Sequence, residues 1–143
     1  MLAEPPEMIS KNDSTRLRDM IGSIRQSLPA LRHPLESYLR DLEGQLARTV
    51  TVPPASVDAN MVTMNSRVRL RDREGGSAQE VTLVYESDAD AFGEKLSVLT
   101  SLGASLLGSR VGDVVEWQSR RGPRRVRIER ILFQPEAAGE FDL

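Results

Sequence analysis

The chain has 143 residues, a formal net charge of −2 and no cysteine. The lack of cysteine excludes disulfide bonds, thiolate catalysis and cysteine metal sites, and the single histidine, His33, excludes a histidine-based metal cluster. The small net charge predicts no general attraction to nucleic acid or anionic lipid. A chain of this length buries roughly two-thirds of its unfolded surface, so we expect it to fold without a bound cofactor or metal.

The N-terminal residues 1–12 contain Pro5 and Pro6 and show no periodicity, which predicts a flexible lead-in. Acidic residues and prolines stand where a secretory signal needs a basic start and an apolar core. No apolar run approaches the ~20 residues that a membrane span requires. We therefore expect a cytoplasmic protein that has no membrane partner.

Residues 13–50 predict a helical hairpin that begins just after Asp13 or Ser14 as its N-cap. Apolar residues recur at intervals of four and three, which places them on one narrow seam. The seam comprises Leu17, Ile21, Ile24, Leu28, Leu35, Leu39, Leu42 and Leu46. Pro29 and Pro34 break a continuous helix, so we expect two antiparallel arms that form a short coiled coil.

Arms of this length are not stable alone and must pack on each other, on the next domain or on a partner. We interpret the seam as the hairpin's own interface, and an exposed stripe for a partner is the alternative. Residues 51–56 are the expected linker, because Pro53 and Pro54 can join neither a helix nor a central strand.

Residues 57–143 predict a small antiparallel α+β domain. The alternation in Arg67–Arg71 should turn Val68 and Leu70 toward the core and the arginines toward water. A short helix, Leu102–Leu107, is closed by Gly108, the residue type that most easily ends a helix. The remaining strands are expected around Val81–Tyr85, Leu96–Leu99, Val115–Trp117 and Val126–Phe133, with turns at 74–76 and 121–123.

The stretch Ser101–Asp113 resembles the signature of the C-terminal domain of the bacterial transcript-cleavage factors GreA and GreB. Further motifs resemble the Rnk branch of that family in order and spacing. These motifs are Val62–Val68, Thr82–Tyr85, Leu96–Val98, Ala104–Gly108, Arg110–Asp113 and Gln134–Gly139. The resemblance implies an FKBP-like sheet with one short helix, carried behind an N-terminal hairpin, and it implies RNA polymerase as the partner.

In the cleavage factors that the chain resembles, the coiled coil enters the secondary channel of RNA polymerase. Two acidic residues at its tip hold a catalytic Mg²⁺, a cation that prefers oxygen ligands. The matching tip here consists of Pro29, Ala30, Leu31, Arg32 and His33. Glu36 is the only acidic residue near it, and the arms are much shorter. We therefore expect a non-enzymatic regulator that binds near the channel, has no catalytic residues and does not stimulate transcript cleavage.

The resemblance also implies a polymerase-binding loop before the short helix of the C-terminal domain. The matching residues are Thr100, Ser101, Leu102 and Gly103, and the family often has proline at the position of Ser101. The alternative function is a stand-alone interaction module, or a homodimer that uses the leucine seam, with a partner other than RNA polymerase.

An arginine cluster lies in the last predicted hairpin and comprises Arg120, Arg121, Arg124, Arg125, Arg127 and Arg130. Arginines on an outward strand face keep a sheet soluble, and the chain has few aromatic residues on which bases could stack. We expect no direct sequence-specific nucleic-acid binding. Contact of the arginine cluster with an acidic surface of a partner protein is the alternative. Trp117 is interpreted as a core residue.

Overall fold

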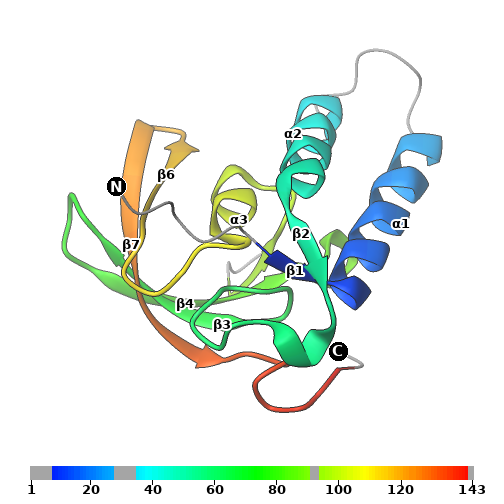
Figure 1. Cartoon of the computed structure of the whole chain (residues 1–143). Helices are drawn as coiled ribbons and strands as arrows, with labels where there is room; N and C mark the ends of the chain where they lie inside the picture. Colours follow the sequence, from blue (N-terminus) through cyan, green and yellow to red (C-terminus); the bar gives the residue numbers. More distant parts are fainter. Residues whose placement is uncertain (1–7, 28–34, 91–93, 142–143) are drawn as a thin grey trace, which may run out of the picture.

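The computed structural model describes residues 8–27, 35–90 and 94–141. The chain forms an α+β fold, as expected, in which two N-terminal helices precede a curled sheet with one short helix (Figure 1). The elements are β1 (Met8–Ser10), α1 (Lys11–Ser27), α2 (Leu35–Arg48), β2 (Val50–Val52), η1 (Pro54–Ser56), β3 (Arg67–Asp72), β4 (Ala78–Val84), η2 (Glu86–Asp88), β5 (Lys95–Ser97), α3 (Ser101–Leu106), β6 (Val114–Ser119) and β7 (Gly122–Phe133).

The main sheet has the strand order β5-β4-β3-β7-β6, and α3 lies in its hollow (Figure 1). Its strands pair in antiparallel fashion except for β4 and β5, which run parallel. The prediction of a purely antiparallel domain is therefore wrong at this edge. The physical reason is that the chain returns to the level of Thr82 before β5 begins, so Lys95 pairs with Thr82 and Ser97 with Val84.

The predicted alternation in β3 is confirmed, because Val68 and Leu70 are fully buried while Arg67 is exposed. The predicted turn at 74–76 ends at Gly76, which has a φ of +72°. Gly108, after α3, has a φ of +81°, a left-handed conformation that glycine adopts without strain. The local turn chemistry of the sequence therefore corresponds to the observed connections.

The N-terminal segment differs from its prediction. Met8–Ser10 forms β1, which pairs in parallel with Val50–Val52 of β2, and α1 begins directly at Lys11. Residues 8–10 are thus not a flexible lead-in, and the expected linker 51–56 begins inside a strand. The two strands meet because the antiparallel helices between them bring the start of α1 and the end of α2 to the same level.

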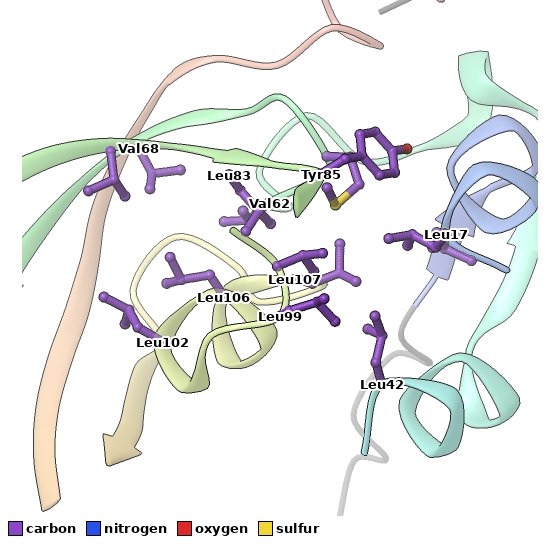
Figure 2. Close-up of a cluster of buried hydrophobic side chains, with 14 of the residues drawn as sticks. Leu17, Leu42, Val62, Val68, Leu83, Tyr85, Leu99, Leu102, Leu106 and Leu107 are labelled. Carbon is purple, nitrogen blue, oxygen red and sulfur yellow. The ribbon is translucent and has the colours of Figure 1, made fainter. Parts of the chain in front are cut away.

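The helical pair and the sheet share one hydrophobic core (Figure 2). Leu17 and Leu42 from the helices lie near Leu99 and Leu107, and they belong to the same buried cluster as Val68 of the sheet. The interpretation of the seam as the hairpin's own interface is therefore too narrow, because the seam also packs on the base. The buried seam residues are Leu17, Ile21, Leu39, Leu42 and Leu46.

Two parts of the predicted hairpin have different outcomes. The antiparallel arrangement of the two arms is confirmed by α1 and α2 (Figure 1). The predicted tip, Pro29–His33, lies outside the described residues. Within the described part of the chain, no helix is long and apolar enough to cross a membrane.

Candidate functional site

The predicted polymerase-binding loop is the N-terminal turn of α3. Thr100 caps this helix, since its Oγ1 accepts a hydrogen bond from the backbone N of Gly103 at 3.0 Å. The same hydroxyl donates to the carbonyl oxygen of Ser97 at 2.7 Å. The loop is therefore held in one conformation by side-chain contacts with its own backbone.

Only half of the predicted loop residues reach the surface. Thr100 is exposed and Ser101 is half-buried, whereas Leu102 and Gly103 are buried. A Cβ atom added at Gly103 would lie 2.0 Å from the carbonyl oxygen of Ser97, so this close approach needs glycine. Leu102 and Gly103 therefore stabilise the loop from inside, and a partner can contact only Thr100 and Ser101.

Ser101 ties α3 to the edge of the sheet. Its Oγ accepts a hydrogen bond from the backbone N of Gln118 in β6 at 3.0 Å. One turn later, the Ser105 hydroxyl donates to the carbonyl oxygen of Ser101 at 2.8 Å and lies 3.2 Å from that of Glu116. These hydroxyls satisfy backbone groups of an edge strand that has no further strand neighbour in the sheet. Ser101 thus has a structural role that a proline there could not supply.

A groove of about 420 Å³ separates α3 from α2 and begins at Ser101. Tyr38 on α2 is 41% exposed in this groove, and Ala104 of α3 is half-buried in it. Gln45 fixes the spacing of the two helices, because its Nε2 donates to the carbonyl oxygen of Leu107 at 2.9 Å. The sequence prediction missed α2 as part of this surface, since nothing local connects Tyr38 with Ala104.

Two acidic residues of α2, Glu36 near the far end of the hairpin and Glu43 seven residues further along the helix, are engaged with arginine. The guanidinium of Arg25 on α1 lies 3.0 Å from Glu36 Oε1 and 2.7 Å from Glu43 Oε1, both on α2. These hydrogen bonds from Arg25 lower the pKa of Glu43. Arg40 also lies 3.4 Å from Glu36. No group of three acidic or histidine side chains that could hold a metal ion occurs among the residues described.

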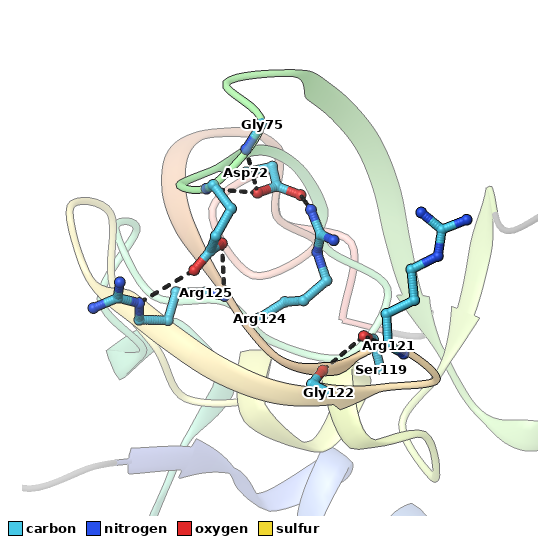
Figure 3. A network of polar contacts seen from close by, with 8 residues as sticks. Asp72, Gly75, Ser119, Arg121, Gly122, Arg124 and Arg125 are labelled. Carbon is cyan, nitrogen blue, oxygen red and sulfur yellow. Dashed lines mark hydrogen bonds and ion pairs between the residues drawn. The ribbon is translucent and has the colours of Figure 1, made fainter.

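The predicted arginine cluster divides into paired and unpaired members (Figure 3). Arg124 binds Asp72 at 2.5 Å, and Arg125 lies 3.4 Å from Glu74. Backbone hydrogen bonding from Gly75, together with Arg124, lowers the pKa of Asp72 to about 2. The guanidinium of Arg121 extends away from this network. Within the described ranges, no ion pair involves Arg120, Arg121, Arg127 or Arg130.

A buried carboxyl group, Asp13, was considered only as a helix cap in the sequence prediction. Its Oδ2 accepts from the backbone N of Met64 at 3.2 Å, and its Oδ1 from the Tyr85 hydroxyl at 3.3 Å. Burial raises the pKa of Asp13 to about 7, and the nearby charge of Glu136 adds to this rise. A signal was present, because Asp13 lies four residues before Leu17 and thus on the seam face of α1.

Asp13 connects the helical pair with two distant parts of the base. Met64 precedes β3, and Tyr85 directly follows β4. Glu136, in the C-terminal segment, accepts a hydrogen bond from the Thr63 hydroxyl at 2.6 Å. The segment 134–140 therefore lies against the base. The arrangement can fix the direction in which α1 leaves the base.

The sequence-family model of the C-terminal domain of the transcription elongation factors GreA and GreB matches residues 57–133. The regulator of nucleoside diphosphate kinase of Escherichia coli K12 is 37% identical over 101 residues, which cover 70% of this chain and 74% of that protein. The transcription elongation factor GreA of Zymomonas mobilis is 29% identical over 133 residues, which cover 92% of this chain and 84% of that protein.

A solved structure, the prokaryotic transcription elongation factor GreA/GreB from Nitrosomonas europaea, has a similar fold and is 37% identical. The superposition has a TM-score of 0.72 and covers 91% of this chain and all of that one. Both the helical pair and the sheet are therefore part of the likeness. With the family model spanning more than half of its residues, the chain belongs to the GreA/GreB family of transcription elongation factors and is a homologue of the regulator of nucleoside diphosphate kinase.

Proposed function

We propose that this protein is a transcription regulator that binds RNA polymerase near its secondary channel without stimulating transcript cleavage. Membership of the GreA/GreB family, through residues 57–133, is the observation that carries the polymerase-binding part of the proposal. The absence of cleavage rests on the dimensions and the charges of the helical pair.

The described helices are short, and part of their length is buried in the base. α1 has 17 residues and α2 has 14, so they extend about 25 Å and about 21 Å at 1.5 Å per residue. Leu17 and Leu42 are fully buried in the common core. Only the part beyond them is available to enter a channel, which favours a position at its mouth, where the protein would compete with longer factors.

The electrostatics of the far end support the same conclusion. A divalent cation needs carboxylate oxygens that are free to coordinate it. Glu36 and Glu43 instead share Arg25, and Glu36 also has Arg40 within 3.4 Å. These contacts hold α1 and α2 together and leave the two carboxylates poorly suited to hold the metal of a polymerase active site.

The groove between α2 and α3 is the surface that we assign to polymerase contact. It contains Ser101, the half-buried residue of the predicted loop, and it adds Tyr38 and Ala104. Leu102 is excluded as a contact because its side chain is only 5% exposed. Aromatic side chains such as Tyr38 often contribute strongly to protein interfaces.

Retention on immobilised core RNA polymerase tests the binding proposal. Replacing Ala104 by Glu, written Ala104→Glu, should weaken retention about tenfold, the effect of a charge in the centre of an interface. The matched control is Ala78→Glu, at an exposed position of β4, which should bind normally. Thermal melts of both variants establish that each is folded. Equal retention of the two variants would refute the groove as the contact.

Two further outcomes test the rest of the proposal. Added GreA should displace the protein from polymerase if the two share the channel mouth, and no displacement would contradict a shared site. In backtracked complexes the protein should leave the RNA uncut while GreA cleaves it. Stimulated cleavage by this protein would contradict the proposed lack of activity.

The alternative of a homodimer through the leucine seam has no supporting observation in the described residues. That alternative would gain weight from an exposed seam. Leu39, Leu42 and Leu46 are buried within one chain, as are Leu17 and Ile21. These five residues of the seam are therefore already covered within one chain and offer no surface to a second copy.

A further inference from the structure

A second groove, of about 580 Å³, lies between α1 and η2, apart from the groove between α2 and α3 that we assign to polymerase contact. Its apolar lining includes Met20 and Ile24, which lie four residues apart on α1 and are half-buried against the core, and Tyr85. Positions four apart on a helix are neighbours on one face. The groove therefore offers a continuous apolar strip about one helical turn long.

The rim of this groove is acidic. Asp19 on α1 and Glu86 and Asp88 on η2 line it, and all three side chains are exposed. In the described part of the chain, none of the three forms an ion pair. Glu86 accepts a hydrogen bond from the Ser97 hydroxyl, which positions the carboxylate but leaves its charge.

Of the described residues that line the groove, one is a cation, and its position does not neutralise the acidic rim. The guanidinium of Arg16 lies over the Tyr85 ring, 4.7 Å from the ring centroid. It thus stands over the aromatic part of the lining. Three acidic side chains and one arginine give the groove a net negative potential, although the whole chain carries a formal charge of only −2.

We infer that this groove binds a short basic segment of a partner protein, in which an aliphatic side chain is flanked by lysine or arginine. The aliphatic side chain would cover Met20 and Ile24, and the flanking cations would meet Asp19, Glu86 and Asp88. Charge complementarity of this kind selects the partner and speeds its association. The acidic rim repels phosphates, so a nucleic acid is not the occupant.

The test uses a short acetylated peptide of alternating lysine and leucine, followed through the methyl groups of methionine by NMR. The Met20 methyl should shift in a saturable way, and the methyl of Met61, which is fully buried in the base, should not. A peptide of alternating glutamate and leucine should leave Met20 unshifted. An unshifted Met20 with the lysine peptide, or equal shifts with both peptides, would overturn the proposal.

Two charge reversals locate the site. Asp19→Lys should weaken binding of the lysine peptide about tenfold at low salt, while Asp41→Lys, an equal change at an exposed position of α2, should have less than about a twofold effect. Equal effects would mean unspecific attraction and would overturn the proposal. Sedimentation of the free protein tests whether a second copy of this chain occupies the groove. A dimer that Asp19→Lys dissociates would identify that copy as the occupant and would overturn the proposal. The assay contains no polymerase, so its failure leaves the proposed function untouched.

Discussion

The two ends of the α1/α2 pair are held by different forces. Near the base, Leu17 and Leu42 are fully buried in the core shared with the sheet, and Asp13 joins the start of α1 to Met64 and Tyr85. At the far end, Arg25 bridges to α2 through partly solvent-exposed ion pairs. Burial contributes far more free energy than exposed ion pairs do. The base end therefore decides how the helices point, and the far end can change with little effect on the fold.

The largest expected effect is a difference in stability between two positions of α2 that receive the same leucine-to-alanine substitution. Leu42→Ala removes a fully buried side chain and should lower the free energy of unfolding by about 2–5 kcal/mol. Leu35→Ala, at the half-buried start of α2, should cost less than half of that. Urea unfolding of both variants measures the difference. Equal losses would mean that the far end is packed as firmly as the base end.

The next effect concerns Asp13, whose pKa is about 7 in the folded protein and 3.8 ordinarily. A carboxyl group with a raised folded pKa stabilises the protein fully below pH 3.8, and this contribution disappears as the pH rises through 7. Between pH 5 and pH 8, the unmodified protein should therefore lose about 3 kcal/mol relative to Asp13→Asn.

Asparagine is close to isosteric with aspartate and can still accept from Met64 N and donate to the Tyr85 hydroxyl. Taking the difference between the two proteins at each pH removes the contributions of other titrating groups. Parallel stability curves from pH 5 to pH 8 would show that the Asp13 carboxyl does not titrate in this range.

The smallest effect is expected at the far end. Arg25→Met removes both ion pairs but keeps much of the apolar stem, so stability should fall only slightly. The loss should disappear in about 0.5 M salt, because exposed charges are screened there. Thermal melts at low and high salt check this. A large loss of stability that persists at high salt would mean that the far end contributes as much to stability as the base end does.

Local patterns predicted much of the fold because their causes lie within a few residues. Alternation in Arg67–Arg71 specifies which side chains face the core. Gly108, just after α3, adopts the left-handed conformation that glycine reaches without strain. The four-and-three spacing of leucines likewise predicted two helices with one buried face each. These features depend on backbone geometry that every chain shares.

The candidate sites were predicted less well, because they depend on residues distant in the sequence. The loop Thr100–Gly103 was located by resemblance, but its division into surface and core residues follows from the packing of Leu102. The groove partners Tyr38 and Ala104 come together only through the contact of α2 with α3. The pairing of Met8–Ser10 with Val50–Val52 was missed for the same reason.

The sequence by itself determined the two long helices, most strands of the C-terminal domain with their turns and, through the resemblance, the GreA/GreB family. Only the tertiary structure decided that the helical pair shares one hydrophobic core with the base and that the carboxyl group of Asp13 is buried. It also decided that Glu36 and Glu43 share one arginine. Periodicity records which face of an element is apolar, but not which surface covers that face. Burial and charge pairing arise from contacts between distant segments, so they become visible only in the folded chain.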